Sequence, residues 1–387
     1  MNVRMLEGNP TRRGVLRFGA IAAGVGVAGS SGRRTESDAD CLSGDRGTNG
    51  EADAPVDVRG AIYFPSRAYN TFQMWHGYDP DVIERDLCYA SRINLNALRV
   101  WLSFETWRRE PLRLGLRLEH FLTTAANHGL RVLLGIFEGI GLNPTERQLQ
   151  NTDPLTARPV FSPSREIMEQ RTRWNLPRRF IRWFMERHRD DSRLLAIELM
   201  NEPGWKPWKM RFARAMFRTL ANQRGRVPLS VGSTNIPNNR DYRTWGSEVY
   251  QCHKNFAHTE GQYRRLLRRI DAAERRTGRP VWLTEWQRLA PPRKGTGTHP
   301  PNYASLAPLI RRAGVGNFFW SLMVKPAYQV YRRKQGLISG IFHEDGAVWS
   351  ADDARAIKAM SGDPTFSGEE RSEWPSWAES VRNAVTD

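Results

Sequence analysis

Two glutamates in this sequence follow apolar runs of the kind that form buried strands. Glu202 follows Leu194–Met200 with only Asn201 between them, and Glu285 closes the run that begins at Pro280. Short apolar runs that end in a polar residue are typical of parallel strands covered on both faces. Two such glutamates at the carboxyl ends of barrel strands can converge on one bond of a bound ligand. Paired carboxylates that divide acid and nucleophile roles indicate glycoside hydrolysis as the chemistry.

Eight apolar runs alternate with amphipathic stretches from Val56 onward. The expected strands are Gly60–Phe64, Ala97–Leu102, Arg131–Phe137, Leu195–Met200, Pro228–Gly232, Glu248–His253, Pro280–Glu285 and Gly316–Trp320. The expected helices lie near residues 80–92, 115–128, 174–188, 206–222, 259–277, 302–313 and 351–360, with one short turn within 235–245. Because eight strands close a barrel, this α/β pattern predicts a (β/α)8 TIM barrel in a single catalytic domain. No GxGxxG or GxxxxGK[ST] motif follows the first run, which excludes the usual nucleotide-binding folds.

Polar residues stand at the carboxyl ends of these runs, which is the active face of a barrel. They are Arg99, Glu138, Asn201, Glu202, His253, Glu285 and Trp320. Three long segments, 138–170, 286–302 and 321–348, fall on the same face and could shape a sugar cleft. The sequence therefore predicts one site at this end of the barrel.

The sequence resembles the clan A glycoside hydrolases, and most closely the cellulase- and mannanase-like barrels of family 5, over residues 56–361. The resemblance rests on these segments: Leu98–Trp101, Met200–Pro203, His253, Thr284–Trp286, Phe319–Ser321 and Gly336–Gly346. It implies a retaining enzyme in which Glu202 is the general acid/base and Glu285 the nucleophile.

The resemblance also implies roles for the residues around this pair. Arg99 is expected beside Glu285, holding it charged, and Asn201 is expected to bind the sugar 2-hydroxyl. His253 is expected to orient groups near the pair, and Trp320 to form an apolar floor under the sugar ring. Glu138 is a candidate sugar contact.

Each assignment has a structural alternative. The two glutamates could be salt-bridge partners in an arginine-rich protein, and Arg99 could bridge to a core carboxylate. His253 could be a satisfied buried histidine, and Trp320 could be plain barrel core. Glu138 could equally be a cap or a loop ion pair.

The sixth strand departs from the family pattern. Many family 5 members carry an aromatic hydroxyl two residues after the sixth-strand histidine, where this sequence has Asn255. The tyrosine that usually steadies the nucleophile is therefore missing or supplied from elsewhere, and Tyr250 on the same strand is one substitute.

The formal net charge of +17 comes almost wholly from arginine, since only seven of the 58 basic residues are lysines. The arginines are scattered over amphipathic helices rather than gathered on one motif, which argues against nucleic-acid binding. A carbohydrate substrate is the expected partner, together with electrostatic association with an anionic envelope or polysaccharide. The chain is expected to act as a monomer.

Three widely spaced cysteines, with no CxxC and no His/Cys cluster, predict neither a metal site nor any cofactor. Buried free thiols are expected at Cys88 and Cys252.

The first 29 residues are expected to be a twin-arginine export signal. Arg12 and Arg13 precede an uncharged run from Phe18 to Gly29 that is too short to span a bilayer stably. Export would place the protein outside the cell or on its surface; the alternative is a retained membrane anchor. The remaining boundaries are a flexible linker at 30–54, the barrel at 55–361 and a C-terminal tail at 362–387.

Two functions from other classes compete with hydrolysis. A catalytically silent barrel that binds polysaccharide would normally have lost one of the two glutamates, and both are present. An exported oxidoreductase is suggested only by the twin-arginine signal, and no cofactor motif supports it.

Overall fold

The structure is a computed structural model that describes residues 58–204, 206–287 and 301–386. The predicted export signal (1–29) and linker (30–54) lie outside the described residues. Within the described part, no helix has the length and apolar character that crossing a membrane requires.

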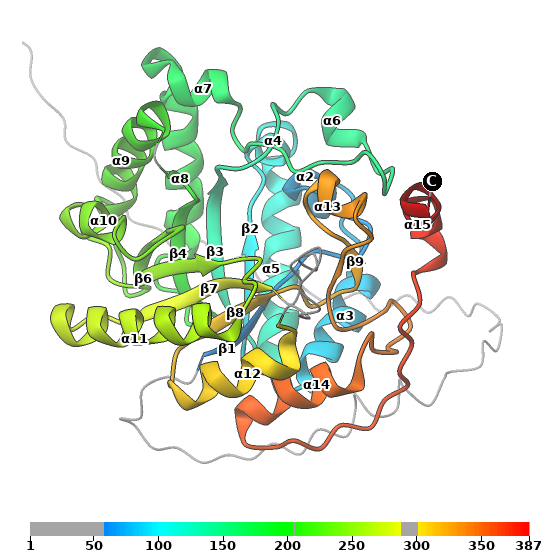
Figure 1. Ribbon diagram of the computed structural model, residues 1–387. Helices are drawn as coiled ribbons and strands as arrows, with labels where there is room; N and C mark the ends of the chain where they lie inside the picture. Colours follow the sequence, from blue (N-terminus) through cyan, green and yellow to red (C-terminus); the bar gives the residue numbers. More distant parts are fainter. Residues whose placement is uncertain (1–57, 205, 288–300, 387) are drawn as a thin grey trace, which may run out of the picture. The chain divides into compact units, whose positions relative to one another are not determined.

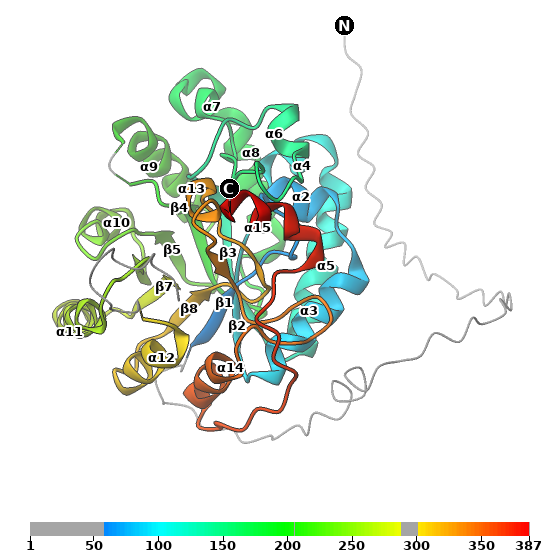
Figure 2. The ribbon, with the colours of Figure 1, turned by 45° about the vertical axis from the view of Figure 1, so that its right-hand side comes forward.

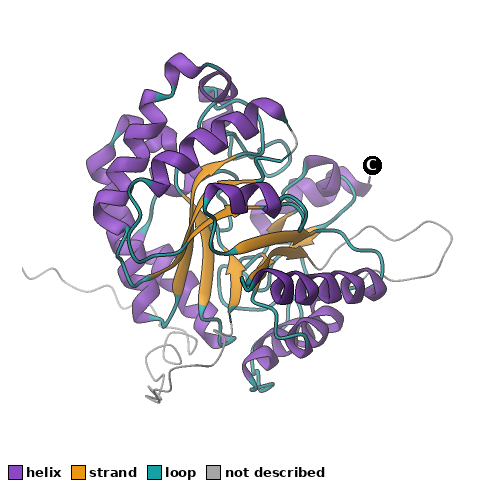
Figure 3. Ribbon diagram, turned by 90° about the vertical axis from the view of Figure 1, so that its left-hand side faces the viewer, coloured by secondary structure: helices purple, strands orange, loops and turns teal. Residues whose placement is uncertain are grey.

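Eight parallel strands form the centre of the fold, and helices surround them (Figures 1 and 3). The strands are β1 (Arg59–Ile62), β2 (Ala97–Trp101), β3 (Arg131–Glu138), β4 (Leu194–Asn201), β5 (Leu229–Gly232), β6 (Tyr250–Lys254), β7 (Val281–Gln287) and β8 (Asn317–Trp320). Their hydrogen-bonded order is β5-β4-β3-β2-β1-β8-β7-β6. A parallel bridge between Ser230 and Val249 joins the two ends of this order beside β5 and β6. The predicted (β/α)8 barrel is thereby confirmed.

The helices that cover the barrel match the expected amphipathic stretches. They are α3 (Pro80–Arg92), α5 (Pro111–Asn127), α8 (Asn175–His188), α9 (Pro207–Ala221), α11 (Glu260–Thr277), α12 (Tyr303–Arg312) and α14 (Ala351–Lys358). The connection from β5 to β6 holds only the short helix α10 (Asn239–Trp245). Side-chain caps fix where helices begin. At the start of α3, the Asp79 side chain accepts hydrogen bonds from the backbone amides of Asp81 and Val82.

Shorter elements lie in the connections and in the C-terminal tail, and sequence periodicity did not predict them. They are α2 (Thr71–His76), α4 (Phe104–Arg109), α6 (Glu146–Gln150), α7 (Arg165–Glu169), α13 (Val330–Arg333), α15 (Glu379–Thr386), the 3-10 turns η1 (Arg171–Arg173), η2 (Ala359–Ser361) and η3 (Ser376–Ala378), and the two-stranded ribbon of β9 (Lys325–Pro326) and β10 (Ile338–Ser339). Figure 2 shows α15, at the end of the chain, in front of the strands. The tail that carries it contacts the barrel loops, because Arg67, in the loop after β1, lies over the ring of Trp377 at 5.8 Å.

The two cysteines of the described region differ. Cys252 is a buried free thiol, as expected, and burial raises its pKa to about 12. Cys88 is disulfide-bonded, so the prediction of a free thiol there was wrong. A lone half-cystine gives no local pattern that distinguishes it from a buried thiol.

Gly135 on β3 makes room for a tryptophan that the site depends on. It pairs with Trp101 of β2, and a Cβ atom added at Gly135 would lie 2.0 Å from the Trp101 ring. Trp101 in turn donates from Nε1 to Glu198 at 3.0 Å and lies against the Arg99 guanidinium, 4.5 Å from the ring centre.

Gly135→Ala should therefore displace the Trp101 ring and lower the free energy of unfolding by about 1–3 kcal/mol, the usual cost of overpacking. The matched control is Gly115→Ala on α5, whose Cβ would meet only Trp183 at an ordinary 3.6 Å. Because alanine favours a helix over glycine, the control should be neutral or stabilising. Denaturant unfolding measures both; equal effects of the two variants would contradict this account of Gly135.

Candidate active site

The seven residues predicted from the sequence lie together at the carboxyl end of the barrel. A pocket of about 80 Å³ lies there, between residues of β2, β3, β4, β7, β8 and the loops that follow. Its lining includes five of the predicted residues, Glu138, Asn201, Glu202, Glu285 and Trp320. The other two, Arg99 and His253, lie behind this lining and contact it through hydrogen bonds.

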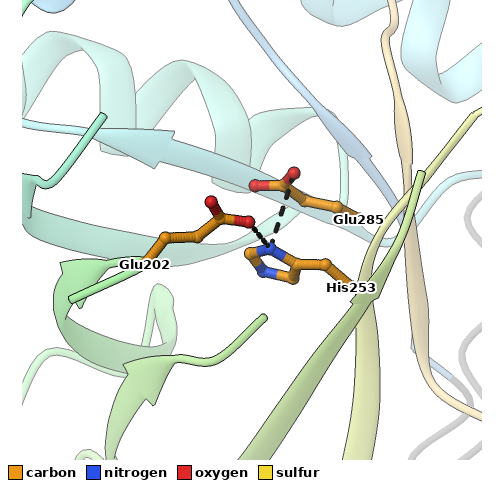
Figure 4. A group of neighbouring side chains, drawn as sticks. All are labelled: Glu202, His253 and Glu285. Carbon is orange, nitrogen blue, oxygen red and sulfur yellow. Dashed lines mark hydrogen bonds and ion pairs between the residues drawn. The ribbon is translucent and has the colours of Figure 1, made fainter. Parts of the chain in front are cut away.

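Glu202 and Glu285 face each other across the site (Figure 4). A carboxylate oxygen of each lies within 4.8 Å of the other, and the His253 ring approaches both. The Glu285 side chain is 10% exposed and that of Glu202 is 20% exposed. The two carboxylates are thus close enough to act on one atom from two directions.

Arg99 connects the strands beneath this pair. Its Nη1 donates to Glu285 Oε1 at 2.9 Å and to the Thr284 carbonyl at 3.1 Å, and its Nη2 donates to Asn201 Oδ1 at 3.0 Å. Since a guanidinium can only donate, the contact fixes which end of the Asn201 amide faces it. Arg99 is fully buried, so these bonds act without competition from water.

Glu198, on the same strand as Asn201, is a partner that sequence reasoning did not identify. Arg99 binds it through two parallel bonds, Nε to Oε2 and Nη2 to Oε1, each 2.9 Å. The alternative of a structural bridge from Arg99 to a core carboxylate is therefore also real, alongside its contact with Glu285. A glutamate inside the apolar run Leu194–Met200 was the available signal, because a buried charge needs a partner.

Glu138 binds the Asn201 amide from the opposite side. Asn201 Nδ2 lies 3.0 and 3.2 Å from the two Glu138 oxygens, and the Ile140 amide donates to Oε1 at 2.7 Å. Burial raises the pKa of Glu138 to about 8, and the nearby charges of Glu285 and Glu202 act in the same direction. At neutral pH this carboxyl is therefore protonated and can donate a hydrogen bond into the pocket.

His253 and Glu202 form a tight pair. Nδ1 of His253 lies 2.5 Å from Glu202 Oε1 and 3.5 Å from Glu285 Oε2. Burial raises the pKa of Glu202, but the hydrogen bond with His253 and the nearby positive charges lower it by more. The pKa of Glu202 therefore lies below its ordinary value. Glu202 also has φ of 43°, a left-handed backbone that non-glycine residues seldom adopt and that is concentrated at functional sites.

Asn255 takes the place that the family pattern gives to an aromatic hydroxyl. Its Nδ2 donates to Glu285 Oε2 at 2.9 Å, so each oxygen of Glu285 has one donor. The suggestion that Tyr250 substitutes for the missing tyrosine was wrong, because Tyr250 lines a different cavity and its hydroxyl has no hydrogen-bond partner among the described residues. Side chains alternate along a strand, so Tyr250 and His253 point to opposite faces of the sheet.

Aromatic rings close one side of the pocket. Trp320 lines it and packs edge-on against Tyr328, with ring centroids 4.9 Å apart. Tyr328 comes from the predicted loop 321–348, and its contribution could not be deduced from the sequence. That loop is anchored by Lys325, whose ammonium donates to the carbonyls of Pro65 and Ala68.

Glu202, His253 and Glu285 are also close enough to share one metal ion. The oxygens that would bind the ion, however, already accept hydrogen bonds. Arg99 and Asn255 donate to Glu285, and His253 is hydrogen-bonded to Glu202. Arg99 would moreover place a positive charge beside any bound cation. The arrangement fits acid–base and nucleophilic chemistry better than metal coordination.

No protein-family model and no curated protein sequence matches this chain. Solved structures do match it. An exo-β-1,4-mannosidase from Opitutaceae bacterium strain TAV5 has a TM-score of 0.58 and 16% identity, over 79% of this chain and 59% of the mannosidase. The chain thus spans less than two thirds of that protein.

Two further structures cover more of their own length. A GH5_18 protein from Bifidobacterium longum subsp. longum, in complex with Manβ1-4GlcNAc, has a TM-score of 0.56 and 15% identity, over 79% of this chain and 78% of its own. A glycoside hydrolase family 5 mannosidase from Rhizomucor miehei has a TM-score of 0.54 and 12% identity, over 84% of this chain and 94% of its own. At such identities the likeness establishes the fold, and the predicted resemblance to this clan is confirmed at that level.

The protonation of Glu138 can be observed directly. The infrared carbonyl stretch of a neutral carboxylic acid should be present at pH 7 and disappear as the pH rises through about 8, since burial favours the neutral form. Subtracting the spectrum of Glu138→Gln isolates this band from those of other buried acids, such as Glu105, whose pKa burial raises to about 7. A difference spectrum with no acid band at pH 7 would show that Glu138 is ionised.

Proposed function

We propose that the chain is a retaining β-glycoside hydrolase that cleaves a β-linked oligo- or polysaccharide. The observation that carries this proposal is the pair Glu202 and Glu285, with carboxylate oxygens within 4.8 Å at the mouth of the barrel. Retaining glycosidases hold their two carboxyls about 5–5.5 Å apart, whereas inverting enzymes need room for a water between carboxylate and sugar. The spacing here leaves no such room.

In the first step, Glu285 attacks the anomeric carbon and Glu202 protonates the departing oxygen. Arg99 and Asn255 each hold one oxygen of Glu285, which fixes the direction of attack. In the second step, Glu202 takes a proton from water, and the water displaces the sugar from Glu285.

Glu202 must carry a proton to act as the acid of the first step. In the free protein its pKa lies below the ordinary value, although burial raises it, because the hydrogen bond with His253 and the charges of Arg99 and Lys209 favour the ionised form. A sugar in the pocket would exclude water from Glu202, whose side chain is 20% exposed. Desolvation raises the pKa of a carboxyl, so substrate binding favours the protonated form of Glu202, from which the proton can be delivered.

Asn201 is suited to bind the sugar 2-hydroxyl. Its Oδ1 is occupied by Arg99, and one N–H of Nδ2 is shared between the two oxygens of Glu138. The second N–H remains for the substrate. Trp320 and Tyr328 offer apolar ring surface to the sugar face.

β-1,4-Mannosides are the first substrates to test, because structures with this fold include a β-1,4-mannosidase and a complex with Manβ1-4GlcNAc. The silent-barrel alternative is disfavoured since both carboxylates are present and oriented, and the oxidoreductase alternative has no cofactor motif in its support.

The stereochemistry of the first product tests the proposal. Two displacements at one carbon restore the starting configuration, so proton NMR should detect a β-anomer before mutarotation. Glu285→Gln, which cannot attack, should lower the rate by at least about a thousandfold and confirms that the product comes from this site. An α-anomer as first product, or Glu285→Gln with more than about a tenth of the rate, would refute the mechanism.

We also propose that the protein is exported, to act outside the cell or on its surface. The disulfide at Cys88 supports this, since disulfides persist in oxidising compartments outside the cytosol. Arg12 and Arg13 before the apolar segment supply the candidate signal.

Replacing Arg12 and Arg13 by lysine keeps the charge but removes the pair that a twin-arginine receptor reads, so the protein should accumulate in the cytosol. Immunoblots of cell fractions measure where the protein accumulates. The control is Arg17→Lys, which leaves the pair intact and should be exported normally. Unchanged export of the double variant would exclude the twin-arginine route.

A further inference from the structure

A second cavity lies on the outer wall of the barrel between α10 and α11, the neighbouring helices labelled in Figures 1 and 2. Its volume is about 840 Å³, and it shares no lining residue with the pocket at the barrel mouth. We call it the Tyr250 cavity, after the β6 residue in its wall. It forms because the connection after β5 holds only the seven-residue helix α10, which leaves part of α11 and β6 uncovered.

Four arginines line the Tyr250 cavity. They are Arg240, Arg243, Arg269 and Arg276, and the only acidic residue in the lining is Asp241. In the part of the chain that the structure describes, none of the four guanidiniums has an ion pair or a side-chain hydrogen bond. On the same helix two arginines outside the lining are paired, Arg264 with Glu260 at 3.1 Å and Arg275 with Asp271 at 2.6 Å. The cavity lining therefore carries an excess of positive charge, four guanidiniums against one carboxylate.

The spacing of the α11 arginines favours an extended ligand. Arg269 and Arg276 are seven residues apart on one face of the helix, about 10.5 Å along its axis. Between them stand Ala272 and Ala273, whose small side chains leave the wall open. Two guanidiniums at this distance suit anionic groups repeated along a chain better than a single small anion.

Tyr250 supplies an unfilled hydrogen-bonding position in the same wall. It is 3% exposed, yet its hydroxyl has no partner within the described residues. A buried hydroxyl without a partner is uncommon and costs stability, so a ligand group that satisfies it would be favoured. Because the ring is buried, it offers no open face on which a nucleic-acid base could stack.

We propose that the Tyr250 cavity binds an acidic oligosaccharide, whose anionic groups pair with the arginines of α10 and α11. Guanidinium groups bind carboxylate, sulfate and phosphate through paired, charge-assisted hydrogen bonds. The cavity lies within the usual size range of ligand sites, roughly 300–1,000 Å³. This site would hold an acidic glycan on the barrel wall, independently of cleavage at the mouth.

Calorimetric titration of the full-length protein tests the proposal with three probes: tetragalacturonate, neutral α-linked maltotetraose and inorganic pyrophosphate. Tetragalacturonate should bind, and Arg269→Gln/Arg276→Gln should weaken it at least about tenfold, because two charge-assisted contacts are lost. Tyr250→Phe, which removes only the hydroxyl, should weaken it by a smaller factor.

The matched control is Arg264→Gln/Arg268→Gln, which removes the same charge from the same helix outside the cavity and should change the affinity less than about twofold, since exposed charges there are solvated. Equal losses in both double variants would mean diffuse attraction and overturn the proposal. Absence of tetragalacturonate binding, equal binding of maltotetraose, or binding of pyrophosphate alone, which would indicate a phosphate site, would also overturn the proposal. Because binding is measured without turnover, none of these outcomes bears on the proposed hydrolysis.

Discussion

The buried guanidinium of Arg99 is the interaction on which the site depends. It is fully enclosed and joins Glu198 and Asn201 of β4 to Glu285 of β7 across the barrel. An arginine in this place must be paired, because an uncompensated charge in the interior is very costly. Its planar fork can serve a bidentate carboxylate on one edge and further acceptors on the other, which a lysine could not do. The same contacts that satisfy the charge also set the nucleophile in position.

The scaffold was predictable from the sequence, because each step depends on local pattern. Buried parallel strands produce short apolar runs, and all eight expected strands are present, with ends shifted by at most a few residues. Polar residues that close those runs, such as Glu202 and Glu285, had to meet at one rim. The short helices, such as α4 and α6, were not predicted, because five or six residues span fewer than two helical turns and show no clear 3.6-residue period.

The hydrogen-bond partners within the site were harder to predict from the sequence, because they come from segments that are far apart along the chain. Glu198 lies 99 residues from Arg99, and Asn255 lies 30 residues from Glu285. The sequence placed Asn255 at the position of a missing hydroxyl but could not show that an amide donor there reaches the carboxylate. Tyr328 comes from a long loop whose path depends on tertiary anchoring. Such contacts require the closed barrel, since register and twist decide which side chains converge.

The charge balance around Arg99 connects the protonation states of the site to the proposed reaction. One guanidinium cannot compensate all four nearby carboxyls, Glu138, Glu198, Glu202 and Glu285. Glu138, which is only 3% exposed, stays protonated because burial raises its pKa to about 8, and Glu202 is hydrogen-bonded to His253. In the proposed reaction, attack by Glu285 converts its carboxylate to a neutral ester. Loss of that negative charge favours the ionised form of Glu202, because like charges raise the pKa of a neighbouring acid and their removal lowers it. Glu202 therefore holds its proton more readily before the sugar is transferred and releases it more readily afterwards, as a residue that acts first as acid and then as base requires.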